Sequence, residues 1–191
     1  MGARYRWGMI DQSHFREQAT LTTPNLILEP LGPQHFEGTW GSINDPESRR
    51  LAGVHEVYTE QEVRAYLASR AAQHDRADWA IIRASDDAFV GTIVLKDLDR
   101  HNETMGFRIS LSTHEAVVGK GYGSEATKAV IDFGFRTVGL HRITLEVVDF
   151  NTRAQRVYGK AGFHPEGLRR EAWLWEGERS DVILMAVMNG H

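Results

Sequence analysis

The chain has 191 residues, of which 41% are hydrophobic and 25% are charged, and it contains no cysteine. These values favour one domain of an ordinary globular protein with a full hydrophobic core. The absence of cysteine excludes disulfides, cysteine nucleophiles and thiolate metal sites, and it fits a reducing compartment. A formal net charge of −4 disfavours general nucleic-acid binding, which needs a strongly basic surface.

The terminal segments suggest neither export nor membrane attachment. Residues 1–20 contain no apolar signal-peptide core and are interpreted as a polar N-terminal extension. The longest apolar run, Val182–Met188, is too short to span a bilayer. We therefore expect a cytoplasmic protein in which residues 21–191 form a single domain, with no membrane or nucleic-acid partner.

The beginning of this domain predicts one strand and two helices. The strand is Asn25–Leu31, which a Gly-Pro pair ends. A short helix is expected within Pro33–Ile43. The spacing of Thr59 and Glu62 matches a capping box, and the apolar residues that follow at helical spacing predict a helix to about Gln73.

Three consecutive strands are predicted next. Trp79–Ala84 and Phe89–Leu95 are rich in β-formers and are separated by a short polar turn, as in a hairpin. Thr104–Leu111 continues the same pattern. Together these segments predict an antiparallel meander.

The segment Gly119–Ala126 alternates three glycines with other residues and leads into an amphipathic helix, Ser124–Val138, which Gly139 ends. Glycine lets backbone N–H groups approach a ligand closely and adopts positive φ. The helix adds unpaired N–H donors and the positive end of its dipole. We interpret the segment as an anion-binding loop suited to phosphate.

The last part of the chain predicts a strand, a helix and a hairpin. His141–Phe150 is the strand, and Asn151 or Thr152 caps the helix that follows. Ala172–Trp175 and Asp181–Met188 flank a Glu-Gly-Glu turn and predict the hairpin. The order of elements indicates a mixed α/β or α+β domain built on a single sheet.

Glycine-rich loops precede helices in several classes of phosphate-binding protein. A nucleotide P-loop needs Ser or Thr after Gly-Lys, but Gly121 follows Lys120 here. A dinucleotide-binding turn needs glycine at the position that Ser124 occupies. The loop alone also fits a glycine-rich turn that binds no ligand.

Another class is the acetyl-CoA loop of the GNAT superfamily of N-acetyltransferases, which this chain resembles in several ordered motifs. The loop is similar to G-x-G-x-A/G-T/S-E-A, and later segments are similar to N-x-x-S/A and Y-x-K-x-G-F. Further segments resemble the branch of ribosomal-protein N-terminal (alanine) acetyltransferases. Val118 departs from the pattern, because the superfamily usually has Gln or Arg there. The resemblance spans roughly residues 21–188, and its segments are Leu21–Leu28, Gly119–Ala126, Asn151–Ala154, Tyr158–Phe163, Pro165–Arg169, Gly177 and Asp181.

The resemblance implies a mixed, mostly antiparallel twisted sheet flanked by helices. The sheet would be split between the strand ending near Leu111 and the strand starting near His141, and acetyl-CoA would bind in this cleft as a co-substrate. Lys120 either adds a cation near the phosphates or is a solvated loop residue. The implied cofactor-binding residues are Ile109, Leu111, Gly119, Lys120, Gly121, Tyr122, Gly123, Ser124 and Asn151.

The resemblance also implies that Tyr158 is the acid that protonates the departing CoA thiolate, with packing in its helix stripe as the alternative role. Asn151 either caps its helix or contacts the cofactor, and the two roles are compatible. Glu103 and Glu146 are candidate general bases, and Glu103 is selected, although both also fit solvated positions of the sheet. An α-amine with a pKa near 8 is about 10% neutral at pH 7, whereas a lysine amine is under about 0.1% neutral, so an α-amine hardly needs a base.

We therefore expect an acetyl-CoA-dependent N-acetyltransferase that acts on a primary amine, by resemblance a protein N-terminal α-amine. A polyamine or other small amine is the alternative acceptor, and a non-catalytic CoA-binding module is the alternative of another class. No metal is expected, because the histidines lack ligand spacing and Asp97–Asn102 lacks the glycine of a calcium loop.

Two further features concern the acceptor and self-association. The wall that faces the acceptor is expected from Pro33–Tyr58 and from the hairpin at residues 172–181. The apolar segment Trp173–Trp175 beside this hairpin predicts a homodimer, although Trp173 also fits a half-buried core position.

Overall fold

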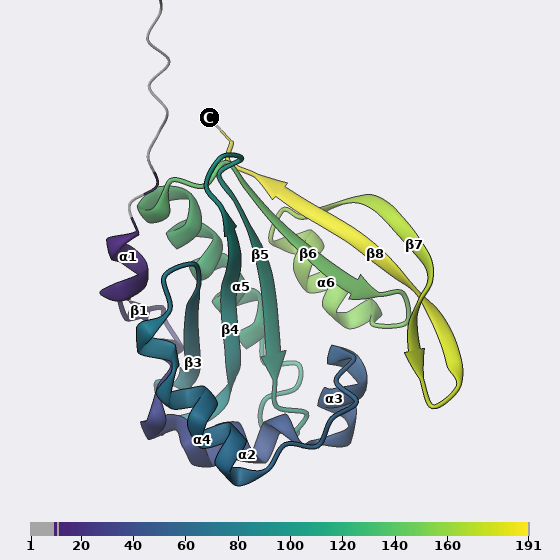
Figure 1. Cartoon of the computed structure of the whole chain (residues 1–191), viewed down its shortest axis with the longest axis horizontal. Helices are drawn as coiled ribbons and strands as arrows, with labels where there is room; N and C mark the ends of the chain where they lie inside the picture. The colour runs from purple at the N-terminus through teal and green to yellow at the C-terminus, as the bar shows by residue number, and fades with distance from the viewer. Residues whose placement is uncertain (1–9, 11, 191) are drawn as a thin grey trace, which may run out of the picture.

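One twisted sheet of eight strands organises the molecule in the computed structural model, which describes residue 10 and residues 12–190 (Figure 1). The spatial order is β1-β2-β3-β4-β5-β6-β8-β7. The strands are β1 (Leu21–Thr22), β2 (Leu26–Pro30), β3 (Ala77–Arg83), β4 (Ala88–Asp99), β5 (Thr104–Leu111), β6 (Arg142–Val148), β7 (His164–Trp175) and β8 (Glu178–Met188).

A single parallel pairing interrupts this otherwise antiparallel sheet. Strand β5 pairs with β6 only where Thr104–Gly106 lie beside Arg142–Thr144. Beyond this point β5 continues to Leu111 and β6 to Val148 without pairing to each other, and Figure 1 shows the two strands diverging. The predicted split between these two strands is therefore confirmed, as is the mixed, mostly antiparallel sheet.

Helices cover both faces of the sheet. In Figure 1, α5 and α6 lie behind the strands, α4 lies in front of them, and α2 and α3 lie at the lower end of the sheet. The helices and helical turns are α1 (Ser13–Arg16), a 3₁₀ turn (Pro33–His35), α2 (Phe36–Ile43), α3 (Pro46–Ala52), α4 (Glu60–Ala68), a 3₁₀ turn (Arg70–Ala72), α5 (Tyr122–Phe133), a π-helical turn (Gly134–Val138) and α6 (Thr152–Lys160).

The alternation of side chains along β3 explains why there are two cores. Trp79 and Ile81 point to one face and pack with residues of α5 and α6. Ala80 and Ile82 point to the other face and pack with residues of α2 and α4. A strand that is apolar on both faces fits a central position in a sheet covered by helices on each side.

Most predicted elements are present, with shifted ends. The capping box of α4 is confirmed, because Thr59 Oγ1 accepts from the Glu62 N–H and the Glu62 carboxylate accepts from the Thr59 N–H. However, α4 ends at Ala68 and a 3₁₀ turn carries the chain on, so the prediction of one helix to Gln73 is wrong. The helix after the glycines starts at Tyr122 and continues into the π-helical turn Gly134–Val138. Gly139, whose φ is +83°, ends this turn.

Helix α3 was not predicted, and strand β7 is longer than predicted. Helix α3 has its own signals, because Asp45 caps it by accepting from the Ser48 N–H at 2.8 Å, Pro46 opens it, and left-handed Gly53 ends it. Strand β7 begins at His164, earlier than the predicted start at Ala172. Residues 164–172 are all exposed and carry no alternating apolar pattern, so pairing with β8 alone identifies them as strand.

The segment before β1 packs onto β3. Phe15 of α1 is 2% exposed and joins the core beneath α5. The Gln18 amide donates to the Asp78 carbonyl oxygen at 2.7 Å, and the Trp79 indole N–H donates to the Ala19 carbonyl oxygen at 2.9 Å. Part of the predicted extension, residues 1–9 and 11, lies outside the described residues.

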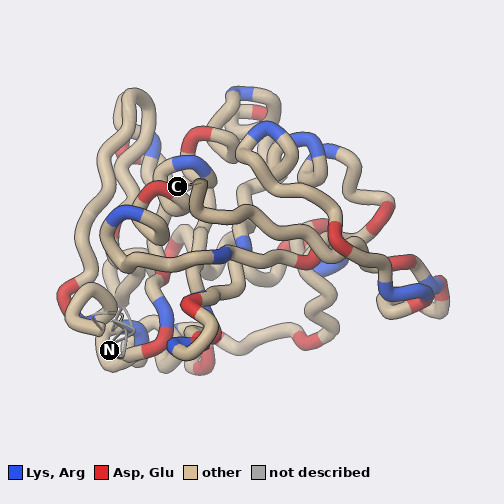
Figure 2. Tube along the Cα trace, turned by 90° about the horizontal axis from the view of Figure 1, so that it is seen from above, with Lys and Arg blue, Asp and Glu red and all other residues tan. Residues whose placement is uncertain are grey.

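Positions of both charge signs are spread along the trace in the view of Figure 2. Within the described part of the chain, no helix is long and apolar enough to cross a membrane. Trp173 and Trp175 are half-buried, whereas Leu174 between them is 44% exposed. A homodimer through this segment stays a prediction, which a mass measurement by light scattering tests.

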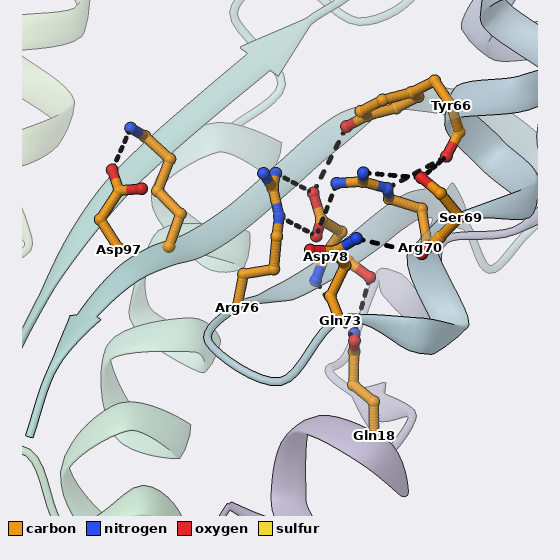
Figure 3. Close-up of polar contacts among 9 residues, drawn as sticks. Gln18, Tyr66, Ser69, Arg70, Gln73, Arg76, Asp78 and Asp97 are labelled. Atoms are coloured by element: carbon orange, nitrogen blue, oxygen red, sulfur yellow. Dashed lines mark hydrogen bonds and ion pairs between the residues drawn. The ribbon is translucent and has the colours of Figure 1, made fainter.

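The Asp78 network is a buried ionic cluster that joins the α4 end to the sheet (Figure 3). Asp78 is 5% exposed and accepts two hydrogen bonds from Arg76, each 2.6 Å long. The Arg70 guanidinium lies 3.7 Å from the same carboxylate, and the Tyr66 hydroxyl donates to it at 3.4 Å. Burial and the Asp78 charge together raise the pKa of Tyr66.

Replacement of the buried carboxylate tests this cluster. Asp78→Asn is expected to lower the free energy of unfolding by about 3 kcal/mol, because two largely buried arginines lose their charged partner. Glu60→Gln, which breaks the exposed pair with Arg64, is the control and should change little. Urea unfolding measures both, and equal midpoints for the two variants would contradict the prediction.

Candidate functional site

A cleft of about 1130 Å³ opens where β5 and β6 diverge. Its volume exceeds that of a pocket for one drug-sized molecule, so it has room for a cofactor arm and a second ligand. Because β5 has no strand partner on this side beyond Gly106, main-chain groups of the strand are available to a ligand. Nine of the predicted site residues line the cleft: Ile109, Leu111, Gly119, Gly121, Tyr122, Gly123, Ser124, Asn151 and Tyr158.

The glycine-rich loop adopts the backbone conformation that its composition favours. Gly119 and Gly121 have φ values of +76° and +86°, in the left-handed region that residues with a Cβ rarely adopt. Gly121 is the N-cap of α5, so the N–H groups of the first helical turn have no partner within the helix. Lys120, the loop residue between them, is exposed and does not line the cleft.

Contacts from neighbouring elements hold this loop in place. The Glu125 carboxylate accepts from the Asn25 backbone N–H at 2.8 Å and from its side-chain amide at 3.0 Å. Burial raises the pKa of Glu125, but the hydrogen bonds from Thr23 and Asn25 outweigh it and lower the pKa overall. On the other side of the loop, the Arg83 guanidinium donates to the Ala116 carbonyl oxygen at 3.0 Å.

Tyr158 on α6 is the buried phenol of the cleft. It is 6% exposed, and the rings of Phe107 and Phe163 meet it edge-on with centroids 6.1 and 5.9 Å away. Burial raises the pKa of Tyr158 to about 12, opposed by the charge of Arg108. The hydroxyl therefore keeps its proton at neutral pH and can donate it in a hydrogen bond.

Asn151 has the capping role that its position predicts, because its side-chain oxygen accepts from the Ala154 N–H at 3.1 Å. It also lines the cleft, so the capping role leaves contact with a ligand open. Three cations of α6 line the cleft as well, and the sequence analysis missed them. They are Arg153, Arg156 and Lys160.

The two glutamates considered as bases lie in different places. Glu103 precedes β5 in the turn at the closed end of the split, where its carbonyl oxygen accepts from the His141 N–H at 2.9 Å. It does not line the cleft, so the structure does not bring it together with Tyr158. Glu146 does line the cleft, but it forms an ion pair with Arg169.

Every carboxylate that lines the cleft among the described residues has a partner. Asp97 pairs with Lys96, and Glu166 pairs with Arg142, which lowers the pKa of Glu166. Glu62 accepts hydrogen bonds from its N-cap, and these lower its pKa too. Within the described chain, no three His, Asp or Glu side chains are grouped to hold a metal ion.

The wall opposite the glycine loop includes residues of α2, α3 and β7. Gly53, which ends α3 with a φ of +64°, lies so close to the Trp173 ring that a Cβ would be 2.3 Å from it. His55 stacks on Trp175 with ring centroids 5.0 Å apart. Both segments expected to form this wall, residues 33–58 and 172–181, contribute cleft residues.

Comparisons with known proteins agree with this geometry. The family model described as acetyltransferase (GNAT) domain matches residues 25–164. The protein named "Probable N-acetyltransferase YjcK" from Bacillus subtilis (strain 168) is 34% identical over 172 residues, covering 90% of this chain and 91% of that protein. Spermidine N(1)-acetyltransferase of Escherichia coli (strain K12) is 26% identical over 114 residues, which cover 60% of each protein. The crystal structure of spermidine N-acetyltransferase from Vibrio cholerae in complex with CoA and spermine gives a TM-score of 0.80 at 19% identity, covering 87% of this chain and 96% of that chain.

The left-handed N-cap of α5 can be tested directly. Gly121→Ala adds a Cβ at a positive φ, which costs about 1 kcal/mol or more, and should weaken CoA binding by about fivefold to tenfold. Gly159→Ala is the control, because this glycine lies within α6 with open space around it. Calorimetric titration with CoA measures both variants. Equal affinities would show that the conformation at Gly121 does not matter for the cofactor.

Proposed function

The chain belongs to the GNAT family of acetyltransferases and is an N-acetyltransferase; from this premise we propose that it transfers an acetyl group from acetyl-CoA to the N-terminal α-amine of a peptide or protein. This acceptor is the one suggested by the resemblance to the ribosomal-protein acetyltransferase branch. The donor is supported by the split sheet, the glycine loop and the fold shared with a structure that holds CoA.

The proposed step forms one bond and breaks another. The neutral amine attacks the thioester carbonyl carbon, the new N–C bond forms, and the C–S bond electrons leave on the CoA sulfur. The amine then loses its proton to solvent. Tyr158 is proposed to donate a hydrogen bond to the departing sulfur, because its buried hydroxyl keeps its proton at neutral pH. A thiol has a pKa of about 8.5, so the CoA thiolate is an adequate leaving group. Complete proton transfer from the Tyr158 phenol, whose pKa is about 12, is therefore unnecessary.

The observation that carries the choice of acceptor is the pairing of every carboxylate among the described cleft residues. Each of these carboxylates already accepts from a cation or from N-cap donors, and no histidine among the described residues lines the cleft. A polyamine or lysine amine, under about 0.1% neutral at pH 7, would need a base to lose its proton. An α-amine, about 10% neutral at the same pH, would not.

A polyamine is the second candidate acceptor, because the E. coli and V. cholerae relatives are spermidine acetyltransferases. A polycation would pair with unpaired carboxylates, whereas the described cleft carries several cations beside its paired acids. A CoA-binding module without turnover is the candidate of another class. The cleft-lining Tyr158 favours an enzyme over this module.

An amine panel tests the proposed function. Purified protein and acetyl-CoA are mixed at pH 7 with a lysine-free peptide bearing a free α-amine, an Nα-blocked lysine peptide, or spermidine, and thiol release is followed. The free α-amine should react at least about tenfold faster than the other two, since its neutral fraction is about 100 times larger. Fastest release with spermidine would favour the polyamine alternative. If none of the three amines causes thiol release, although CoA binding is measurable, the module is favoured.

The role of Tyr158 gives a separate prediction. Tyr158→Phe keeps the edge-on ring packing but removes the hydroxyl, so kcat should fall by about 100-fold while CoA affinity stays unchanged. Steady-state kinetics and CoA titration measure the two quantities. Wild-type turnover in this variant would leave Tyr158 with a packing role alone.

A further inference from the structure

Of the four buried polar atoms that lack a hydrogen-bond partner in the described chain, three belong to residues that line the cleft. They are Thr39 Oγ1, Arg49 Nε and Trp173 Nε1. Buried polar groups in native proteins are nearly always paired, so an unpaired group needs an explanation. The fourth atom, Arg70 Nη1, belongs to the Asp78 network instead. The concentration of the other three in one cleft points to a bound ligand.

These groups come from elements that are fixed against one another. Thr39 lies on α2 and is 3% exposed. Arg49 lies on α3, where its guanidinium donates to the His55 carbonyl oxygen and sits 6.0 Å from the Trp175 ring. Trp173 packs on Gly53 at the end of the same helix. Arg49 and Trp173 therefore belong to one contact between α3 and β7.

The chemistry of the groups selects the kind of ligand. Guanidinium and indole N–H groups only donate hydrogen bonds, whereas the threonine hydroxyl can donate or accept. A ligand that satisfies Arg49 and Trp173 must offer acceptor oxygens. A protonated polyamine offers only donors and positive charge, so it leaves both groups unpaired and adds repulsion from Arg49.

We infer that Arg49 and Trp173, supported by Thr39, recognise the carbonyl or carboxylate oxygen adjacent to the amine of the acceptor. This inference rests on the proposed function and narrows its substrate class to α-amino acyl compounds. The first peptide carbonyl of a protein N-terminus and the carboxylate of a free amino acid share this chemistry. The three groups lie on α2, α3 and β7, which are separate in sequence from the glycine loop before α5.

Two substitutions remove the donors with little change in shape. Trp173→Phe removes the indole N–H and keeps an aromatic ring over Gly53, and Arg49→Lys removes Nε and keeps the charge. Trp175→Phe is the matched control, because it removes an indole from the same strand that does not line the cleft.

The measured quantity is the ratio of kcat/KM for a free-α-amine dipeptide amide to kcat/KM for an alkylamine of similar length without a carbonyl. The same two amines are used for every variant, so their pKa difference cancels. Trp173→Phe and Arg49→Lys should each lower this ratio by about tenfold, and Trp175→Phe should not change it. A merely structural role would lower both kcat/KM values together and leave the ratio unchanged.

The outcomes separate this inference from the proposed function. An unchanged ratio in both Trp173→Phe and Arg49→Lys, in an enzyme that still acetylates amines, overturns the inference alone. A wild-type enzyme that acetylates no amine overturns the proposed function itself. A free amino acid is tested beside the dipeptide amide, and the one whose kcat/KM falls relative to the alkylamine in Trp173→Phe and Arg49→Lys identifies the source of the recognised oxygen.

Discussion

The short parallel pairing of β5 with β6 is the constraint on which the rest of the site depends. Only Thr104–Gly106 and Arg142–Thr144 pair, and both strands run from this closed end toward the open end of the split. Parallel neighbours require a crossover connection, and α5 with its preceding loop supplies it. Because β5 finishes at the open end, the loop and the first turn of α5 must begin there.

The same geometry brings a second helix to the opening. Strand β6 also finishes at the open end, and Asn151 caps α6 directly after it. Two helices therefore start beside the split, each with N–H groups that lack a partner within the helix. Tyr158 follows on α6, in the apolar layer shared with Phe107 of β5. The tyrosine is thus held beside the cleft by the core itself.

Sequence was sufficient for the parts of the fold that depend on local patterns. The strand Thr104–Leu111 has the predicted bounds, and glycine spacing located the turn of positive φ that precedes α5. Helix α3 was missed because its apolar stripe is weak, although Asp45, Pro46 and Gly53 carry its ends. Strand β7 was underestimated because its first nine residues are exposed and depend on β8 for pairing.

The candidate site also contains residues that local patterns predicted and residues that only long-range contacts bring to the cleft. The predicted site residues lie on contiguous motifs, and nine of them line the cleft. Glu103 was chosen as a candidate base because it lies directly before β5. That end of β5 is paired with β6 and the other end borders the cleft, so the Glu103 side chain does not line the cleft. Arg49 and Trp173 carry no motif, and only the contact between α3 and β7 reveals them. Ion pairs across strands, such as Glu146 with Arg169, were equally invisible to local patterns.

The contact of Gly53 with the Trp173 ring has a consequence for how such enzymes diverge. A side chain at position 53 would collide with the indole, so position 53 can enlarge only if residue 173 becomes smaller. A larger residue on the helix requires a smaller one on the strand, and the width of the acceptor wall changes with the exchange. The glycine loop and α5 take no part in that exchange. The width of the cleft beside α3 and β7 can therefore change while the backbone of the glycine loop stays the same.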